Sequence, residues 1–509
     1  MLSSDRASDA IVIGGGTNGL ACATRLAQSG RKVTLLESAD HIGGGAVTTE
    51  FAPGYRVSGL AHILHMLDPR VARGMALDKH GLTLIASNLS TTLLGNDPLV
   101  MTGQRVSGLS STDQQAWDAL STKLTRFANA LAPFRQMTPP RPARGVGNDL
   151  AKLARLGLNL RRMGQTDFRE FLRMILINVA DVLEDDLTDD RLMGLLAFDT
   201  MLGAWLGPRS PNSLILLLNR LSGGALTLPR GGMGAVADAM AQSAQAAGVN
   251  IRTNANVARI EITTDRATGV ALTNGETLTA GLIVSAINPR TTFENLVGPR
   301  GFDTGLLRQS RNIRSRGGAA KLHLALTGTP DFRGADLKSR LVIAPSVNAV
   351  ENAFNPVKYN EVPAHPVMEI ILPSAHEPGM APQGHHSLSA VVQFAPHAPA
   401  DPDRARSTML ANILTTLEDH APGIGALIAR SELLMPYDIA ARYGMQGGNW
   451  HHGELAVEQM LFLRPFAGVS QYETPLPGLW LAGAGAHPGG GISGASGWNA
   501  AERIIKVQP

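Results

Sequence analysis

The chain has 509 residues, a formal net charge of +3 and one cysteine. This length predicts two or more structural units that share a core. The small charge argues against a nucleic-acid surface, and one cysteine excludes both a disulfide framework and a dithiol relay. Residues 1–9 lack the apolar core of a signal peptide, and no apolar run is long enough to span a membrane, so we expect a cytoplasmic protein.

Residues 10–37 carry the pattern of a dinucleotide-binding βαβ unit. An apolar run that predicts a buried strand is followed by glycines, a helical stretch, a second strand and the acidic residue Glu37. Gly14 permits the tight turn, Gly16 lets the backbone approach a pyrophosphate, and Gly19 lets the helix pack closely on the strand. The helix start offers N–H groups to phosphate, and Glu37 is placed to accept hydrogen bonds from ribose hydroxyls.

Two further glycine-rich segments favour FAD over a nicotinamide cofactor. One follows Glu37 at residues 43–45, and the other, at residues 478–494, reads as a strand, a glycine-rich loop and a helix start. A nicotinamide cofactor does not need such a second, distant cradle, whereas FAD does. Besides the residues named above, we therefore expect FAD to contact Thr17, Asn18, Ser38, Gly43, Gly44, Gly45, Ala46, Ala286, Gly483, Ala484, Gly490, Gly491 and Ile492.

Five segments spread along almost the whole chain match one group of proteins in order. They are VIGGGTNGL at 12–20, IGGGAVTTE at 42–50, PRGGMG at 229–234, GGNWHHGE at 447–454 and GAHPGGGISGASG at 485–497. In these segments the chain resembles the flavin-dependent amine oxidase and phytoene desaturase superfamily. The resemblance implies a backbone contact of Val257 with the flavin nucleotide, a helical region over the pocket, and a helix start near 490–494 that points N–H groups at the ring.

The expected fold class is α/β. It consists of a Rossmann-type, glutathione-reductase-like FAD-binding domain and an interleaved α+β substrate domain with a mixed or antiparallel sheet and a helical cap. We expect the FAD-binding domain at 1–70, 225–300 and 455–509. We expect the substrate domain at 71–224 and 301–454, with its cap at about 112–224.

Strand and helix patterns alternate through the expected substrate domain. Short strands at 82–86, 91–94 and 99–102 read as edges of an antiparallel sheet, and helical periodicity covers 112–134. The remaining strands of this domain are expected at 317–326, 341–344, 367–372 and 388–394, with a helix at 402–420 and a strand-like run at 460–463.

Residues 148–164 form a basic stretch with apolar residues at helical spacing. One interpretation, which we favour, is an outer helix with a solvated face. The alternative is a helix that lies on an anionic membrane surface and admits a lipophilic substrate, which would make the protein membrane-peripheral.

His62, His65 and Lys321 are ionisable residues in apolar surroundings. The two histidines fall in a predicted helix without a third ligand at suitable spacing, so we assign no metal. Lys321 interrupts an apolar strand, which costs free energy unless its ammonium finds a partner. The resemblance implies that Lys321 holds a water against flavin N5, and the alternative is an edge-strand lysine that points to solvent.

His452, Glu454 and His487 are the other candidates for catalysis. His452 and Glu454 lie among glycine-flanked polar residues near the end of the substrate sheet, which suits proton handling. The alternative is a structural loop that is hydrogen-bonded to itself. His487 belongs to the carboxyl-terminal glycine loop and is either a titratable neighbour of the flavin or a hydrogen-bonding loop residue.

The substrate is expected to be a lipophilic small molecule. Amine oxidases of the resembled superfamily place aromatic residues on both sides of the amine, whereas this chain offers Tyr443 or Trp450 as one wall. We therefore expect an FAD-dependent desaturase or dehydrogenase that forms a C=C bond and passes electrons to O2 or a quinone. The alternatives are oxidation at C–N or C–O bonds, redox-neutral isomerisation, and a flavin-bound interaction protein without turnover. The sequence does not indicate an oligomeric state.

Overall fold

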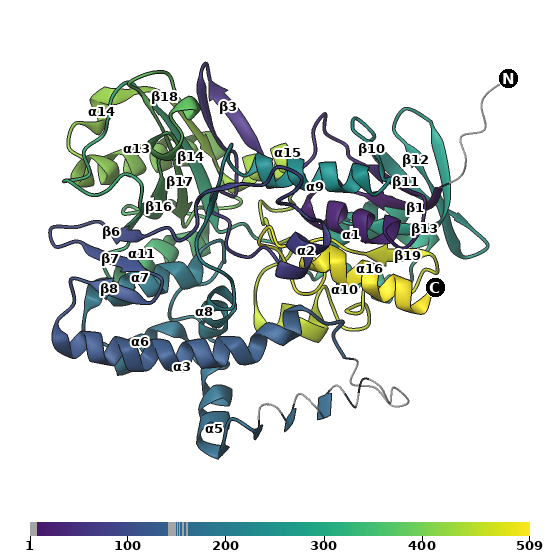
Figure 1. Ribbon diagram of the computed structural model, residues 1–509, viewed down its shortest axis with the longest axis horizontal. Helices are drawn as coiled ribbons and strands as arrows, with labels where there is room; N and C mark the ends of the chain where they lie inside the picture. The colour runs from purple at the N-terminus through teal and green to yellow at the C-terminus, as the bar shows by residue number, and fades with distance from the viewer. Residues whose placement is uncertain are drawn as a thin grey trace.

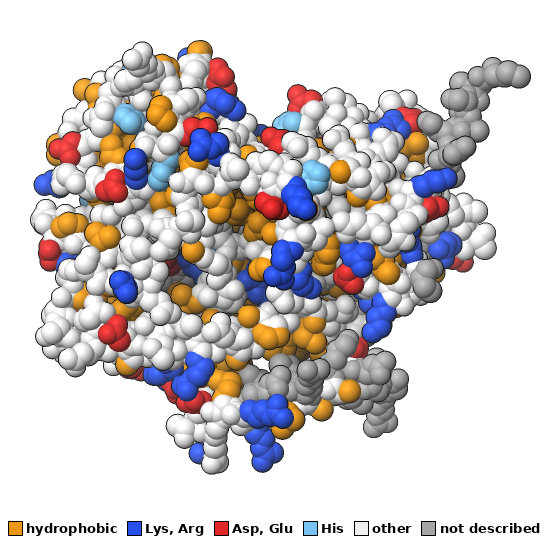
Figure 2. All heavy atoms as spheres, in the orientation of Figure 1, with side chains coloured by type: hydrophobic (Ala, Val, Ile, Leu, Met, Phe, Trp, Pro, Cys, Tyr) orange, Lys and Arg blue, Asp and Glu red, His pale blue; other side chains and the backbone are white. Residues whose placement is uncertain are grey.

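The computed structural model describes residues 8–140, 149, 151, 153–154, 157–158 and 161–508 (Figure 1). Much of the basic stretch at 148–164 lies outside the described residues, so its two interpretations stay predictions. Two sheets lie side by side in Figure 1, each covered by its own helices. Basic and acidic side chains are interspersed over the face in Figure 2, as the small net charge predicts.

The first sheet has the strand order β10-β2-β1-β13-β12-β11, with β19 also paired to β13. Its strands are β1 (Ser8–Ile13), β2 (Val33–Leu36), β10 (Asn250–Arg252), β11 (Val257–Thr263), β12 (Arg266–Leu272), β13 (Thr277–Ser285) and β19 (Leu479–Leu481). Strands β10, β2, β1, β13 and β19 pair in parallel, and β11 to β13 form an antiparallel meander. Every residue of β2 is buried, as expected for an apolar run inside a parallel sheet.

Three helices from distant parts of the chain pack beside this sheet. Helix α1 (Thr17–Ala27) lies between α9 (Gly234–Ala246) and α16 (Ala495–Val507) in Figure 1. A Cβ added at Gly497 would lie 1.8 Å from the backbone oxygen of Asn18, so glycine allows α16 to approach α1 this closely. The predicted Rossmann-type FAD-binding fold is confirmed, and it joins the two ends of the chain.

The second sheet has the strand order β18-β14-β17-β16-β15-β6-β7-β8. Its strands are β6 (Thr91–Leu93), β7 (Leu99–Thr102), β8 (Arg105–Ser107), β14 (Ala319–Leu326), β15 (Arg340–Ile343), β16 (Val367–Ile371), β17 (His386–Gln393) and β18 (Ile428–Leu434). Helix α13 (Pro402–His420) packs on it through Met409, Ile413 and Leu417. Helix α11 (Val347–Phe354) belongs to a separate core that it shares with the cap helices.

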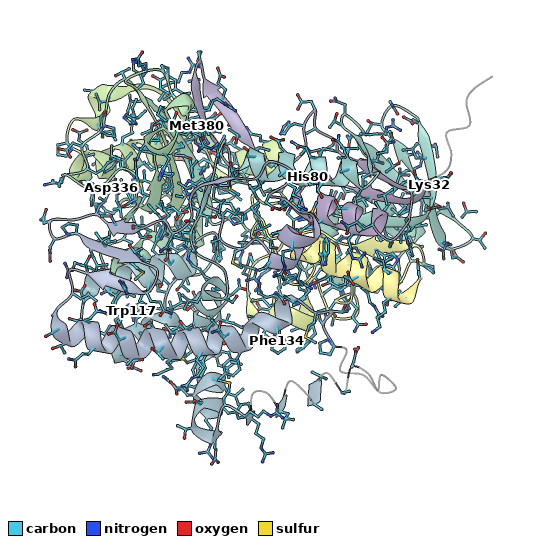
Figure 3. The ribbon with its side chains drawn as sticks, in the orientation of Figure 1. Lys32, His80, Trp117, Phe134, Asp336 and Met380 are labelled. Atoms are coloured by element: carbon cyan, nitrogen blue, oxygen red, sulfur yellow. The ribbon has the colours of Figure 1, made fainter. Side chains whose placement is uncertain are left out.

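Helices between the two halves of the second sheet form the cap. They are α3 (Ser111–Arg135), α5 (Gln165–Met174), α6 (Val179–Asp186), α7 (Asp190–Met201) and α8 (Leu214–Leu221). Figure 3 labels Trp117 on α3 and Phe134 near its carboxyl end. The Trp117 indole N–H donates to the Gln104 carbonyl over 2.8 Å, which ties α3 to the loop between β7 and β8.

Shorter elements complete the described chain. They are α2 (Pro69–Gly74), β3 (Thr48–Ala52), β4 (Tyr55–Ser58), β5 (Leu84–Ala86), β9 (Leu228–Pro229), α10 (Thr304–Arg311), α12 (Pro373–His376), α14 (Ile424–Leu427), α15 (Pro436–Tyr443) and the π-helix Thr291–Val297.

Three local predictions were wrong. Residues 61–66 are extended, with exposure alternating residue by residue, and Leu64 pairs with Thr227 through two backbone hydrogen bonds of 2.9 Å. The run at 460–463 forms a 3-10 turn at Leu461–Leu463 instead of a strand. Strand β5 pairs with β9 in a separate small sheet, so residues 82–86 are no edge of the larger sheet.

Candidate active site

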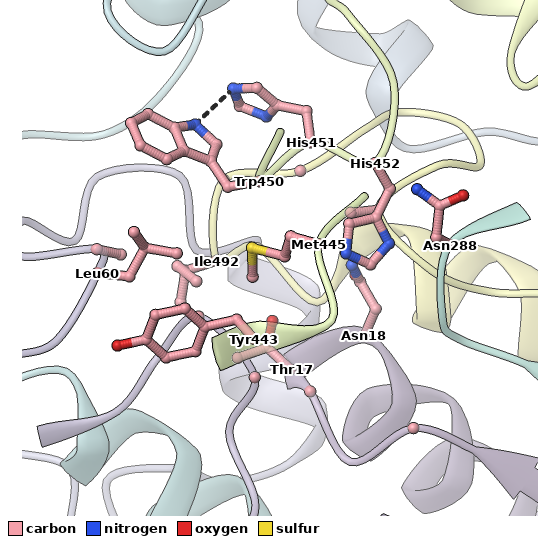
Figure 4. Close-up of a pocket in the computed structure, with 18 of the residues that line it drawn as sticks. Thr17, Asn18, Leu60, Asn288, Tyr443, Met445, Trp450, His451, His452 and Ile492 are labelled. Atoms are coloured by element: carbon pink, nitrogen blue, oxygen red, sulfur yellow. Dashed lines mark hydrogen bonds between the residues drawn. The ribbon is translucent and has the colours of Figure 1, made fainter. Parts of the chain in front are cut away.

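A cavity of about 510 Å³ is lined by residues of the first sheet, the second sheet and the cap. One part of its wall comes from the first βαβ unit and the loop after β2. Another part comes from the extended segment at 60–66, from α7 and α8, and from residues 443–455. Figure 4 shows the region where Thr17, Tyr443, His452 and Ile492 converge from these separate parts of the chain.

The turn after β1 requires its glycines. Gly14 has a φ of +102°, and a Cβ added at Gly19 would lie 1.9 Å from the Gly14 oxygen. The carboxylate of Glu37 accepts from the Gly15 N–H over 2.7 Å and from the Ala39 N–H over 2.9 Å. Glu37 thus fixes the turn while also lining the cavity.

The start of α1 suits a phosphate group. Gly16 is the N-cap, no side chain caps the helix, and its first turn has no acidic residue. The first N–H groups of a helix have no partner inside the helix and favour an anion. A Cβ added at Gly16 would meet nothing closer than the Gly44 Cα at 3.9 Å, so open space lies in front of this backbone.

Several buried polar atoms along the cavity have no partner within the described residues. They are Asn18 Oδ1, Asn288 Nδ2, His451 Nδ1 and His452 Nδ1. In Figure 4, His452 lies beside Asn18 and Asn288, which come from α1 and from the loop after β13. Because unpartnered buried polar atoms are costly, their convergence fits a bound ligand rich in hydrogen-bonding groups, as FAD is.

Most of the residues expected to contact FAD line the cavity. They are Gly14, Gly16, Thr17, Asn18, Gly19, Glu37, Ser38, Gly43, Gly44, Gly45, Val257, Ala286, Ala484, Gly490, Gly491 and Ile492. Ala46 and Gly483 lie behind the wall. The Ala46 N–H donates to the Gly43 oxygen over 3.0 Å, and the Gly483 oxygen accepts from the Ser496 hydroxyl over 2.8 Å. These two residues support neighbours that line the cavity.

A buried chain of ionisable groups adjoins the cavity. Lys321 Nζ lies 2.9 Å from His62 Nδ1, and His62 Nε2 lies 2.9 Å from Glu369 Oε1. Arg340 donates to Glu369 over 2.6 Å and to Asp199 over 2.5 Å. His62, Glu369 and Asp199 line the cavity, while Lys321 and Arg340 lie behind them.

Burial and these contacts set the charges along the chain of groups. Burial lowers the pKa of Lys321 to about 7, so its amine exchanges a proton near neutral pH. Burial and the neighbouring Lys321 lower the pKa of His62 to about 4, which keeps the imidazole neutral. Burial alone would raise the pKa of Glu369, but Arg340 and His62 hold it below its usual value.

Lys321 does not point to solvent. Strand β14 is an inner strand paired with β17 and β18, and the Lys321 side chain is completely buried. The alternative of an edge-strand lysine is therefore wrong. Lys321 reaches the cavity through His62, and its role at flavin N5 stays a prediction.

The other three catalytic candidates lie in different settings. His452 lines the cavity, and burial together with Arg464 lowers its pKa to about 4. The Glu454 carboxylate accepts from Arg316 over 2.7 Å and from Arg314 over 3.1 Å, behind the cavity wall. His487 donates from Nε2 to the Phe134 oxygen over 2.6 Å and thereby joins the carboxyl-terminal loop to α3.

Sequence reasoning missed the charged residues Asp199, Arg220, Arg340 and Glu369. Arg340 and Glu369 each stand in an apolar strand, β15 and β16, and both are fully or almost fully buried. A charge inside a run such as RLVI or VMEII is the signal that could have found them, because a buried charge needs a partner.

The cavity wall near this network is mainly apolar. It includes Leu60, Ile63, Met66, Leu202, Leu216, Val391, Met445 and Leu455, with the aromatic rings of Tyr443 and Trp450. The Trp450 indole N–H donates to His451 Nε2 over 3.0 Å, as the dashed line in Figure 4 marks. This wall can enclose an apolar molecule and exclude water.

Two searches of the described residues returned no site. None of the helices there combines the length and the apolar character needed to cross a membrane. Within the same residues, no three histidine, cysteine, aspartate or glutamate side chains gather as metal ligands.

The fold and the glycine cradle define an FAD-dependent oxidoreductase. Residues 19–505 match the family described as flavin containing amine oxidoreductase, and the chain belongs to this family. The chain is similar to pyridine nucleotide-disulfide oxidoreductase domain-containing protein 2 of Rattus norvegicus, with 29% identity over 98% of this chain and 93% of the relative.

Two bacterial relatives are also similar over nearly their whole lengths. One of the polypeptides of the limonene dehydrogenase of Castellaniella defragrans is 26% identical over 99% of this chain and 96% of the relative. Hydroxyneurosporene desaturase of Cereibacter sphaeroides is 29% identical over 97% of both chains. Among solved structures, a putrescine oxidase variant superposes with a TM-score of 0.63 at 15% identity, covering 98% of both chains, and this likeness concerns the fold.

Proposed function

We propose that the protein dehydrogenates a lipophilic small molecule and converts a C–C bond into a C=C bond. The observation that carries the proposal is the apolar wall beside the buried ion network, represented by Leu60, Leu202 and Leu216. The names of two relatives, a limonene dehydrogenase polypeptide and a hydroxyneurosporene desaturase, support the same class of reaction.

Bound FAD supplies the redox chemistry, because its ring accepts two electrons and one hydrogen from the substrate. The other substrate hydrogen leaves as a proton. Glu369 and His62 line the cavity, and His62 links Glu369 to Lys321 Nζ. A proton that reaches Glu369 therefore has a hydrogen-bonded path to an amine that is partly neutral near pH 7.

The cofactor side of the cavity has a different task. Thr17 and Asn18 at the start of α1 would hold the pyrophosphate, and Asn288 and His452 would donate to or accept from the rest of FAD through their unpartnered atoms. Trp450 and the apolar wall would exclude water from the reacting carbons.

Oxidation of a C–N bond is the second candidate, because Tyr443 and Trp450 both line the cavity. Anaerobic titration of the yellow holoenzyme separates the two functions. We expect lipophilic alkenes to bleach the flavin absorbance near 450 nm, and alkyl amines to leave it unchanged. Bleaching by amines alone would reject the proposal in favour of the second candidate.

A matched pair of variants tests the apolar wall. Leu202→Gln puts an amide into the cavity and should slow bleaching by the lipophilic substrate by roughly tenfold or more, since burying an unpaired polar group is costly. Leu172→Gln changes a leucine on α5 that is 41% exposed and outside the cavity, and it should bleach at the wild-type rate. Equal rates for both variants would contradict the proposed substrate site.

The electron acceptor is proposed to be O2 or a quinone. The reduced holoenzyme is mixed with air-saturated buffer or with a short-chain quinone, and the return of the 450 nm band is followed. Recovery with either acceptor supports the proposal, and a band that stays bleached with both contradicts it.

A further inference from the structure

The cavity has a polar end under the cap. His65, Asn219 and Arg220 line it together with Asp199, and they come from the extended segment at 60–66, from α8 and from α7. The wall elsewhere near the network is apolar, so these side chains form a distinct polar patch. The patch is not needed for FAD, whose expected contacts lie on the βαβ unit and the glycine loops.

Hydrogen-bond donors outnumber their partners in this patch. Arg220 lies 3.3 Å from Asp199, its ion-pair partner among the described residues, and its side chain is 14% exposed. Asp199 already accepts a hydrogen bond of 2.5 Å from Arg340. Since a guanidinium has five N–H donors, Arg220 keeps free donors at the cavity wall.

Two neighbours of Arg220 add to the unused donors. In the part of the chain that the structure describes, the side chains of His65 and Asn219 make no hydrogen bond to another residue. Burial, followed by the charge of Arg220, holds the pKa of His65 well below its usual value, so the imidazole is neutral and offers one N–H.

The charges around the patch favour an anion over a cation. The carboxylates of Glu369 and Asp199 are both bonded to Arg340, and Arg220 supplies a second guanidinium. Two carboxylates and two guanidiniums cancel, and any proton on Lys321 or His62 makes the group positive. A buried positive group with free donors is most stable with an acceptor-rich anion beside it.

We propose that Arg220, Asn219 and His65 bind a carboxylate at one end of the lipophilic substrate. This inference rests on the function proposed above and narrows its substrate class to lipophilic carboxylic acids. The carboxylate would occupy the polar end under α8, and the hydrocarbon part would extend along the apolar wall toward Trp450 and Met445. Arg220 is then a residue that determines specificity.

Ligand titration of the holoenzyme tests this subsite without turnover. The probes are decanoate, methyl decanoate and 1-decanol, which share a similar chain and differ in the polar end. The readout is the shift of the flavin absorption spectrum, checked by calorimetry. We expect decanoate to bind at least about tenfold more tightly than either neutral probe, because hydrogen bonds to charged groups are the stronger ones.

Arg220→Gln should weaken decanoate binding by roughly 10- to 100-fold and change 1-decanol binding by less than about twofold. The control is Arg209→Gln, which removes an arginine of the same cap region that is 40% exposed and paired with Glu184 outside the cavity. It should bind decanoate like the wild type. Arg220→Lys keeps the charge and should retain most of the affinity, which guards against a variant that fails through misfolding.

Equal binding of decanoate and 1-decanol by the wild type would overturn the inference, and so would unchanged decanoate affinity in Arg220→Gln. Because these measurements record binding alone, they are independent of the dehydrogenation test. Selective decanoate binding without flavin bleaching by any lipophilic compound would support the subsite and reject the proposed reaction.

Discussion

Gly16 is the residue whose side chain would face the cofactor and nothing else. Its φ of −71° suits alanine, and the nearest protein atom to an added Cβ lies 3.9 Å away. We expect Gly16→Ala to fold with an unchanged melting temperature but to bind FAD about tenfold or more weakly, because the Cβ occupies the space of the pyrophosphate. The ratio of flavin to protein absorbance after purification, with a fluorescence titration of FAD, measures this.

Gly281→Ala is the control, since this glycine is exposed on β13 and an added Cβ meets nothing within 4 Å. It should keep its full flavin content. A Gly16→Ala protein that purifies with as much FAD as the Gly281→Ala protein would contradict the assignment of the cradle.

Lys321 makes stability depend on pH. Burial lowers its pKa in the folded protein from the ordinary value of 10.5 to about 7. Between these values the unfolded chain binds this proton and the folded chain does not, so the free energy of unfolding rises with pH across this window. Lys321→Met removes the group and should remove this rise.

Urea unfolding of wild type and Lys321→Met at several pH values between 7 and about 9.5 measures the effect. The difference in free energy of unfolding should move in favour of the wild type as pH increases. Parallel curves for the two proteins would mean that Lys321 keeps an ordinary pKa, and the proton path through His62 would lose its end point.

At the scale of elements, the contact of α1 with α16 holds the two ends of the chain together. A Cβ at Gly497 would lie 1.8 Å from the Asn18 oxygen, on the backbone of α1, which cannot move aside cheaply. We expect Gly497→Ala to destabilise the protein by about 1–3 kcal/mol, the usual cost of overpacking. Thermal unfolding should show a lower melting temperature than Gly281→Ala, and an equal value would contradict the close packing of the helices.

Elements with strong local patterns could be predicted from the sequence. The βαβ unit at 10–37 has its glycines, periodicity and acid within one short stretch, and the helix at 402–420 agrees with α13 (Pro402–His420). The segment at 61–66 was predicted as a helix because its two histidines are three residues apart. Its extended form depends on pairing with Thr227, which no local pattern indicates.

The candidate site divides in the same way. The glycine cradle is written in one motif, so its residues were predicted and most of them line the cavity. The ion network could not be assembled from sequence, because His62, Arg340 and Glu369 meet only when β15 pairs with β16 and the extended segment crosses them. The sequence did indicate Lys321 as a lysine in need of a partner, but not which partner.

On the scale of the whole molecule, the cavity exists only because distant segments fold together. Its wall combines the first βαβ unit, the cap helices, the second sheet and the glycine loop near the carboxyl end. This arrangement puts the nucleotide cradle and the ion network at different parts of one enclosed space. A reaction at the flavin ring can therefore use the network without exposing the substrate to water.

The mass of the product from a single anaerobic turnover tests the proposed function most directly. One equivalent of a lipophilic substrate that bleaches the flavin is mixed with holoenzyme, and the extracted product is weighed by mass spectrometry. The proposed dehydrogenation predicts a product lighter by two hydrogens, with one flavin reduced per product formed. A product of unchanged mass, one that has gained oxygen or one that has lost ammonia would contradict it.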